Sequence, residues 1–217
     1  MRHINQAARS RYSDTRQQIL NTAQTIILGK GFAAVGLNEI LKTAGVPKGS
    51  FYHYFESKEH FGSVLLENYF DQYMLTLDAH FHTDNNSAID RLISYFDNWK
   101  ISQCSDTSID KCLVVKLSGE VTDLSESMRL ALKQGTHRVI NRLASVIQEA
   151  VDKGEISIDD DAQTVTEEIY YLWIGATLPA HQGQSQPGCF ACRDESITSK
   201  IKPPPGQKLN PFYLPQN

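Results

Sequence analysis

Apolar residues recur at helical spacing along most of this 217-residue chain. In the first long segment, Ile19, Ala23, Ile26 and Ile27 fall on one side of a helix, and Ser13 stands where an N-cap is needed. No stretch alternates polar and apolar residues for long enough to predict a strand. The pattern therefore predicts an all-α protein.

Later segments repeat this pattern and carry their own boundary signals. Ser57 can cap a helix that follows it, and two pairs stand in capping-box spacing, Asp123 with Glu126 and Asp160 with Gln163. The last of these helices is predicted to bury one face, which consists of Val165, Ile169, Leu172, Trp173 and Ala176. Beyond about residue 183 the chain holds six of its eight prolines and no apolar stripe, so we expect a loop or tail there.

The stretch GVPKGSFYHYF, residues 45–55, joins two short predicted helices, 37–44 and 48–54. Gly45 can adopt the left-handed conformation at the turn, and Val46 can fill the angle between the helices. Pro47 suits the start of the second helix, where its missing N–H would be unpaired in any case. Two helices joined by such a turn predict a helix-turn-helix.

The second helix of this motif presents two different faces. Phe51 and Phe55 are four residues apart and are predicted to pack on the preceding helices. Ser50, Tyr52 and His53 then point outward, where hydroxyl and imidazole groups can read base edges or phosphates in a major groove. The helix opens with Lys-Gly-Ser, whose backbone N–H groups suit a phosphate.

Charge supports a polyanionic partner for the N-terminal part of the chain. Net charge is −4, but residues 1–62 carry eight Lys/Arg against four Asp/Glu. A basic head on an acidic body suits nucleic acid at one end. Nothing resembles a secretory signal, and no apolar run could span a bilayer, so we expect a cytoplasmic protein without a membrane partner.

Residues 13–62 closely resemble the TetR family of bacterial transcriptional repressors. The matching motifs are TRQQILNTAQTIILGKGF and GLNEILKTAGVPKGSFYHYFESKEHF. The resemblance implies a homodimer that binds double-stranded operator DNA and leaves it when a small-molecule inducer binds the helical body. The positions it implies for DNA contact are Asn38, Lys48, Gly49, Ser50, Tyr52, His53 and Lys58. The expected organisation is a basic arm (1–12), a three-helix helix-turn-helix domain (13–62), a helical regulatory and dimerisation domain (63–182) and a divergent Pro-rich tail (183–217).

The body resembles a narrower group, the electrophile-responsive, NemR-like branch of the family. The motifs are CLVVKLSGEVTDLSESMR (112–129) and YLWIGATL (171–178). The resemblance implies that Cys112 is a sensing thiol for reactive electrophiles or oxidants and that Cys104 is a possible second thiol. TetR-type dimers pair two C-terminal helices from each subunit, and the tail replaces the last of these in this chain. The resemblance therefore leaves the dimer interface open.

The residues around Cys112 allow two interpretations. If 111–118 is helical, Lys111 and Lys116 lie close to the sulfur and favour a thiolate. The alternative is a small buried residue with no chemical role. On one continuous helix eight residues rise about 12 Å, beyond the limit of roughly 7 Å between the Cα atoms of a disulfide. A Cys104–Cys112 disulfide therefore requires Ser105–Ser108 to fold back as a loop, which its composition permits, so the question stays open.

Two rival functions remain. A reversible apolar or aromatic inducer could bind a pocket lined by Phe96, Trp99, Tyr170 and Trp173. A thiol-redox enzyme could use Cys189 and Cys192, although neither a zinc pattern nor a βαβ unit surrounds them. No set of residues suggests another enzyme, a metal site or a cofactor, so we expect a regulator that is not an enzyme.

Overall fold

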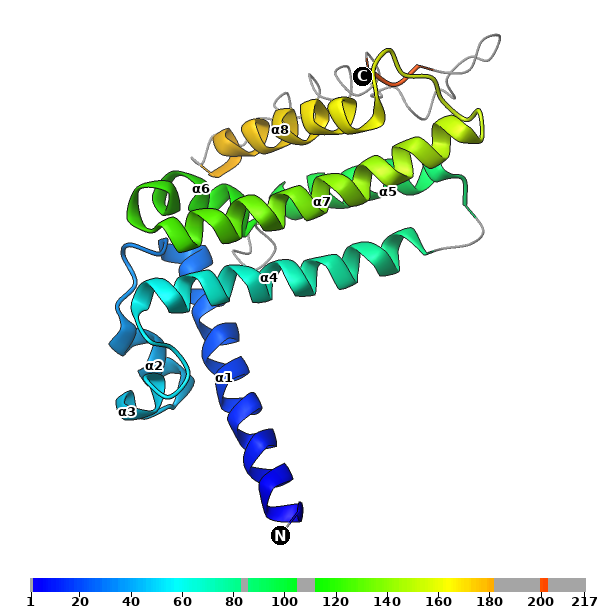
Figure 1. Ribbon diagram of the computed structural model, residues 1–217. Helices are drawn as coiled ribbons and strands as arrows, with labels where there is room; N and C mark the ends of the chain where they lie inside the picture. The colour runs from blue at the N-terminus through cyan, green and yellow to red at the C-terminus, as the bar shows by residue number, and fades with distance from the viewer. Residues whose placement is uncertain (1, 83–85, 105–111, 182–199, 203–217) are drawn as a thin grey trace. The chain divides into compact units, whose positions relative to one another are not determined.

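The structure is a computed structural model that describes residues 2–82, 86–104, 112–181 and 200–202. Eight helices account for nearly all of the described residues (Figure 1). They are α1 (Arg2–Lys30), α2 (Leu37–Ala44), α3 (Lys48–Phe51), α4 (Lys58–Phe81), α5 (Ala88–Cys104), α6 (Leu113–Leu124), α7 (Glu126–Asp152) and α8 (Ala162–His181). The expectation of an all-α fold is confirmed. No helix within the described ranges is long and apolar enough to cross a membrane.

The chain divides into two compact units. Unit 1 comprises Met1–Gln72 and Thr107–Gly135, and unit 2 comprises Tyr73–Asp106 and Thr136–Asn217. Both α4 and α7 contribute their first part to one unit and the remainder to the other.

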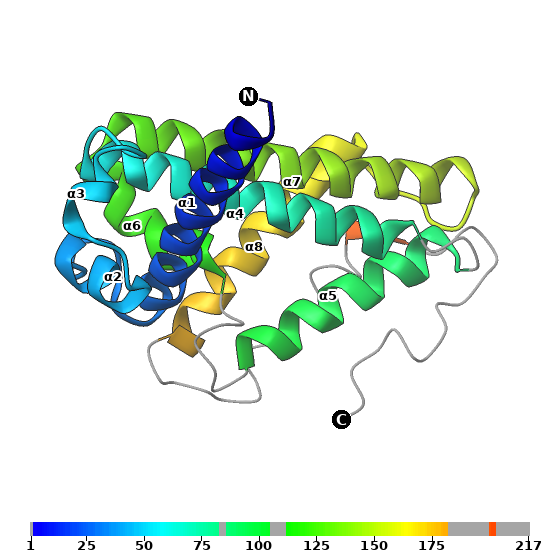
Figure 2. The ribbon, with the colours of Figure 1, turned by 90° about the horizontal axis from the view of Figure 1, so that it is seen from below.

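The helix-turn-helix of unit 1 has the predicted turn. Figure 2 shows α2 beside α1, with α3 following α2. Gly45 has φ 66° and Val46 is buried beneath the turn, while Pro47 is the residue before α3. The second helix is shorter than the expected range 48–54: α3 ends at Phe51, and residues 52–54 form a turn. The backbone explains this, because the N–H groups of His53 and Tyr54 donate three residues back, as in a tightened final turn.

The helix α1 is longer than the sequence predicts. It begins at Arg2, so Ser13 lies inside a helix and the expected N-cap there is wrong. A side-chain cap is needed only where backbone N–H groups lose their intrahelical partners, and residues 2–12 supply carbonyl groups for the next turns. The helix ends at Lys30, and Gly31 follows with φ 88°.

Unit 1 is held together by close packing at two glycines. Gly62 of α4 lies so near Met128 of α7 and Phe32 that a Cβ atom there would overlap both side chains. Gly135 of α7 lies equally close to the Phe70 ring of α4. Both glycines are buried. The first parts of α4 and α7 therefore approach each other closely, which larger residues at these positions would prevent.

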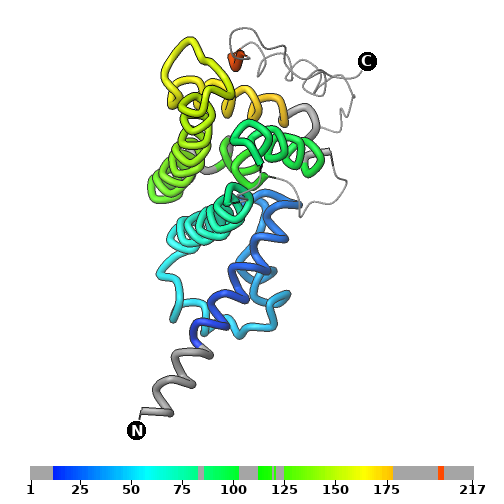
Figure 3. Tube along the Cα trace, turned by 90° about the vertical axis from the view of Figure 1, so that its right-hand side faces the viewer, coloured from blue at the N-terminus to red at the C-terminus, as the bar shows by residue number. Residues whose placement is uncertain are grey.

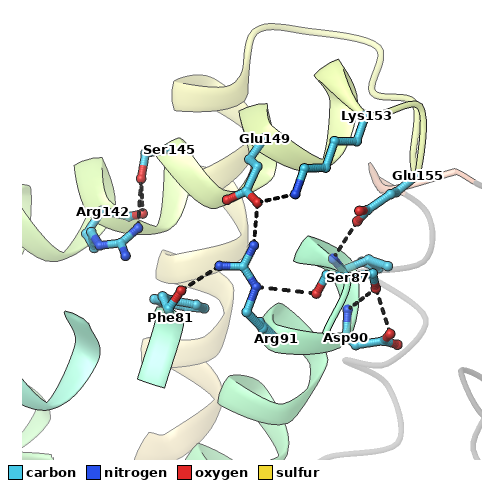
Figure 4. Close-up of polar contacts among 10 residues, drawn as sticks. Phe81, Ser87, Asp90, Arg91, Arg142, Ser145, Glu149, Lys153 and Glu155 are labelled. Carbon is cyan, nitrogen blue, oxygen red and sulfur yellow. Dashed lines mark hydrogen bonds and ion pairs between the residues drawn. The ribbon is translucent and has the colours of Figure 1, made fainter. Parts of the chain in front are cut away.

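Unit 2 is organised around one buried arginine, shown in Figure 4. Arg91 of α5 donates through one terminal nitrogen to the Phe81 carbonyl (2.6 Å) and through the other to Glu149 of α7 (2.5 Å). Lys153 also donates to Glu149, at 2.7 Å. These hydrogen bonds lower the pKa of Glu149, the bond from Lys153 most and that from Arg91 next. Arg91 thereby joins the end of α4 to α5 and α7.

Two expected helix starts are displaced by one or two residues. Ser125, rather than Asp123, precedes α7, and its Oγ accepts the N–H of Met128 (3.4 Å). Asp161, rather than Asp160, precedes α8 and accepts the N–H groups of Gln163 and Thr164, both at 3.0 Å. Two capping residues stand within two positions of each other at each site, so the spacing could not choose between them.

The buried face of α8 is partly as expected. Val165, Ile169 and Trp173 are buried, but Leu172 is 47% exposed and Ala176 is half-buried. Leu172 is therefore a correction to the expected face. It directly precedes Trp173, and consecutive residues on a helix point about 100° apart, so both cannot face the same core.

Three residues near the C-terminus are fixed to unit 2. Lys202 and Ser157 exchange two backbone hydrogen bonds of 2.9 Å as an isolated antiparallel bridge. Figure 3 shows the segment 200–202, in red, beside the connection between α7 and α8. Ile201 is buried, and the flanking lysines form 2.5 Å ion pairs, Lys200 with Glu168 and Lys202 with Asp159. The rest of the expected tail, with Cys189 and Cys192, lies outside the described residues.

Candidate DNA-binding and sensing sites

The residues 48–54, here called the recognition segment, present the predicted polar groups at the surface. Lys48, Gly49 and His53 are exposed, Tyr52 is 61% exposed, and Ser50 is half-buried. They are brought together on and directly after α3. Such groups can contact phosphates and base edges.

An aromatic core supports the recognition segment from below. Phe51 and Phe55 are 0% and 1% exposed, which confirms their expected burial. Their ring centroids lie 5.0 Å apart, and Phe61 of α4 lies 5.5 Å from Phe51 and 4.9 Å from Phe55. Aromatic pairs in such tilted and edge-to-face arrangements stabilise beyond their area. The short helix therefore has a rigid base.

Tyr12 is a supporting residue that the sequence analysis missed. Its hydroxyl donates to the His53 carbonyl (3.0 Å), and its ring centroid lies 4.5 Å from that of Tyr54. The long α1 brings Tyr12 to the end of the recognition segment, 41 residues away in sequence. No local pattern signals a contact over such a separation.

Two predicted DNA-contact residues lie on other helices. Asn38 is exposed in the first turn of α2. Lys58 is half-buried at the start of α4, and its Nζ lies 5.0 Å from the centre of the Phe32 ring. Ser57 caps α4 as predicted, since its Oγ accepts the N–H of His60 (3.0 Å). The contact with Phe32 is a cation–π interaction within unit 1, which the sequence did not indicate.

Cys112 lies immediately before α6, and its sulfur contacts α4. The Sγ atom is 3.9 Å from the Tyr69 hydroxyl, and the Cys112 carbonyl accepts the N–H of Lys116 (3.2 Å). Burial raises the pKa of the Cys112 thiol, an effect only partly offset by the backbone N–H groups of Val115 and Val114 and by the Tyr69 hydroxyl. The expectation of a favoured thiolate is therefore wrong, because loss of water around the sulfur outweighs the hydrogen bonds that stabilise the anion.

The second predicted thiol, Cys104, falls only in part within the described residues. Cys104 is the last residue of α5, and its side chain lies outside the described part of the chain. Residues 105–111, on which a Cys104–Cys112 disulfide depends, are also outside it. Both the second thiol and the disulfide therefore stay predictions.

The four residues predicted to line a ligand pocket form one buried group in unit 2, here called the aromatic cluster. Ring centroids are 4.8 Å apart for Phe96 and Trp173, 5.7 Å for Trp99 and Tyr170, and 5.9 Å for the two tryptophans. The cluster joins α5 to α8. Both indole Nε1 atoms are buried and lack a hydrogen-bond partner. An unpaired buried donor costs about 1–3 kcal/mol, so the cluster contains two polar groups that its own packing does not satisfy.

Comparison with known proteins finds family matches for both the N-terminal and the C-terminal part of the chain. The tetR family of bacterial regulatory proteins matches residues 19–61, and a tetracyclin repressor-like C-terminal domain matches residues 88–189. The HTH-type transcriptional repressor NemR of Escherichia coli strain K12 is 38% identical over 172 residues, 79% of this chain and 86% of that protein. The transcriptional regulator AcuR of Cereibacter sphaeroides is 34% identical over 76% of this chain and 75% of its own length.

A solved structure of one of these relatives has a similar fold. The crystal structure of the reduced form of E. coli NemR matches with a TM-score of 0.81 and 35% identity, covering 88% of this chain and 99% of that one. The N-terminal match contains α2, α3 and the recognition segment, and the C-terminal match contains α5 to α8. The family consists of regulators rather than enzymes, which removes the thiol-redox enzyme as a rival. The chain belongs to the TetR family of DNA-binding transcriptional repressors.

Proposed function

We propose that this repressor leaves its operator when a reactive electrophile or oxidant modifies Cys112. The observation that carries the proposal is the position of the sulfur, which lies 3.9 Å from the Tyr69 hydroxyl of α4. The same helix begins at Lys58, separated by three residues from the end of the recognition segment, and both places belong to unit 1. A group added to the sulfur therefore presses on the helix that leads straight into the DNA-binding motif.

The DNA contacts follow from the exposed side chains. Lys48 is a phosphate ligand, while Tyr52 and His53 reach base edges or phosphates in the major groove. Gly49 and Ser50 are small and permit close approach of the helix to the DNA groove. Asn38 and Lys58 contact the sugar-phosphate backbone of the DNA on either side. Two copies of the motif read half-sites about 34–36 Å apart.

The chemistry at Cys112 begins from a neutral thiol. The raised pKa of the thiol keeps the reactive thiolate scarce near pH 7. When the proton leaves to solvent, the N–H groups of Val114 and Val115 and the Tyr69 hydroxyl stabilise the sulfur anion. Addition to a maleimide then forms one S–C bond, and the neighbouring carbon takes a proton from water. Strong electrophiles at sustained concentration are therefore the inducers that suit this site, with Cys104 as a second thiol.

The homodimer uses the exposed face of α8. Tyr171 and Leu172 are 58% and 47% exposed, and Gly175 follows one turn later on the same side. Large exposed apolar groups beside a small residue suit helix pairing between two copies. Lys200 forms its ion pair with Glu168, one turn before Tyr171, so the C-terminal segment borders this face.

The experiment is an operator-binding assay on DNA upstream of the protein's own gene. Wild type and Cys112→Ser are compared with and without N-ethylmaleimide, and the modified residue is located by mass spectrometry. We expect both proteins to bind and only wild type to be released. Equal release of both would refute Cys112 as the sensor, and a failure of both to bind any half-site pair would refute the DNA-binding assignment for this chain.

A reversible inducer at the aromatic cluster is the second candidate. The two unpaired indole N–H groups favour it, because a ligand with an oxygen acceptor would satisfy them. The chain contains only two tryptophans, Trp99 and Trp173, so tryptophan fluorescence reports on this site alone. Quenching and operator release by 2-acetylnaphthalene in Cys112→Ser, but not by 2-isopropylnaphthalene, would establish it. Absence of quenching with both probes would eliminate it.

A further inference from the structure

The turn between α1 and α2 is bound by a side chain from α6. This turn, residues 31–36, leads directly into the helix-turn-helix. The Ala33 N–H donates to Glu120 Oε2 at 2.9 Å, although the two residues are 87 apart in sequence. All the residues concerned belong to unit 1.

The approach of Glu120 to the turn depends on a glycine. The other carboxylate oxygen lies so close to Gly31 that a Cβ atom would overlap it. Gly31 also has φ 88°, which an L-residue rarely adopts. The next residue, Phe32, is buried, and its ring contacts Lys58 of α4. The turn is therefore the place where α6 and α4 both touch the segment leading to α2.

The helix α6 connects this contact to Cys112. Cys112 immediately precedes the helix, and Glu120 lies eight residues further on, about 12 Å along the axis. Leu113 and Leu117, between them, are both 0% exposed. A helix anchored by two fully buried residues moves as one body, so a displacement at its first residue also displaces Glu120.

We propose that Glu120 is the positioning residue through which the state of Cys112 reaches the helix-turn-helix, an inference that rests on the proposed function of that thiol. Glu120 bound to the turn holds α2 and the recognition segment in the arrangement that binds DNA. Modification of Cys112 shifts α6 and withdraws the carboxylate. Ala33 is exposed, so water takes over its N–H and the contact breaks without leaving a buried donor unpaired.

The test compares operator affinity before and after reaction with N-ethylmaleimide in four full-length proteins. They are wild type, Glu120→Ala, Glu120→Gln and the control Glu39→Ala. Glu39 is a matched control because its carboxylate pairs with Lys30 (2.5 Å) across the same turn but comes from α2. The readout is the ratio of the two dissociation constants, with Cys112 occupancy confirmed by mass spectrometry and helix content by circular dichroism.

For wild type we expect alkylation to weaken binding by about tenfold or more. Without the reagent, Glu120→Ala should bind the operator about threefold to tenfold more weakly than wild type. Alkylation should then change its dissociation constant by less than about twofold. Glu120→Gln keeps an oxygen acceptor and should retain most of the wild-type ratio, as should Glu39→Ala. Amide exchange at Ala33 should rise on alkylation in wild type and be high throughout in Glu120→Ala.

Three results would overturn the proposal, and the measurements distinguish them. If Glu120→Ala keeps the wild-type ratio, the role of Glu120 is refuted while Cys112 stands as the sensor. If the wild-type ratio itself is one with Cys112 fully alkylated, the proposed function fails, and the signalling role of Glu120 fails with it. A ratio that is lost equally in Glu39→Ala would also overturn the proposal, since removal of any carboxylate at the turn would then abolish the response.

Discussion

The two units differ in how completely the polar groups that matter for function are paired. In unit 1, the Cys112 sulfur lies against the Tyr69 hydroxyl, and the Ala33 N–H is bound by Glu120. In unit 2, both terminal nitrogens of Arg91 donate hydrogen bonds, to the Phe81 carbonyl and to Glu149. The buried indole N–H groups of Trp99 and Trp173, in contrast, have no hydrogen-bond partner. A chemical change in unit 1 must therefore disturb an existing contact, whereas the aromatic cluster of unit 2 could gain contacts from a ligand. The first suits a covalent switch and the second a reversible one.

The largest effect should come from Arg91→Ala in unit 2. Removing Arg91 leaves the buried Phe81 carbonyl without its donor, at a cost of about 1–3 kcal/mol of unfolding free energy. It also breaks the pair with Glu149, whose side chain is 35% exposed. Urea unfolding followed by tryptophan fluorescence measures it, because both tryptophans lie in unit 2. Arg142→Ala is the control: the side chain of its partner Asp78 is 51% exposed, and such pairs contribute about 1 kcal/mol or less. Equal losses for the two variants would contradict the central role of Arg91.

A matched pair of glycines gives the next largest effect. Gly31 in unit 1 and Gly154 in unit 2 both follow a helix with positive φ, 88° and 67°. Alanine at either position costs about 1–2 kcal/mol in backbone strain. At Gly31 the new methyl group also collides with Glu120, whereas at Gly154 nothing lies within 4 Å. We expect Gly31→Ala to lose more stability in thermal unfolding, and adding Glu120→Ala to reduce the difference. Identical losses at both sites would argue against the close Glu120 contact.

The reactivity of Cys112 should depend steeply on pH. Its pKa is raised in the folded protein, so less thiolate is present at pH 7 than for free cysteine. The rate of alkylation should rise about tenfold per pH unit through and beyond the ordinary cysteine pKa of about 8.5. Tyr69→Phe removes one donor to the sulfur and should slow the reaction further. Stopped-flow alkylation of a protein with Cys104, Cys189 and Cys192 replaced by Ser measures both, and a plateau below pH 8 would disprove the raised pKa.

Acid should affect unit 2 by a smaller amount. The folded-state pKa of Glu149 is lowered, chiefly by the hydrogen bond from Lys153. The ionised carboxylate thus contributes stability above its unfolded pKa of about 4.3, and this is lost as pH falls through the folded value. The urea midpoint of tryptophan fluorescence should decline over that range in wild type and decline less in Glu149→Gln. An identical decline in both would assign the acid sensitivity to other carboxylates.

Local sequence signals predicted the DNA-binding motif well. Gly45, Val46 and Pro47 fix a turn through backbone preferences, and Phe51 with Phe55 fixes the buried face by spacing alone. Each of these signals acts over a few residues. The same reasoning predicted the membership of the aromatic cluster, because four large aromatic side chains on two apolar helix faces have few places to pack.

Other features could not be predicted, since their causes are distant in sequence. Ser13 suggests a helix start only if nothing helical precedes it, and α1 continues to Arg2. Leu172 matches the apolar pattern, yet it is exposed because Trp173 takes the buried direction. The contacts of Glu120 with Ala33 and of Cys112 with Tyr69 join α6 to α1 and α4, and burial of the sulfur reverses the effect expected from the nearby lysines.

The bridge between Lys202 and Ser157 has a consequence for how this end of the chain can evolve. The connection from His181 to Lys200 has both of its ends held, one by α8 and the other by the pairing and the buried Ile201. Substitutions of Ile201, or of the lysines on either side of it, should therefore be selected against, because these three residues hold the pairing with Ser157 in place.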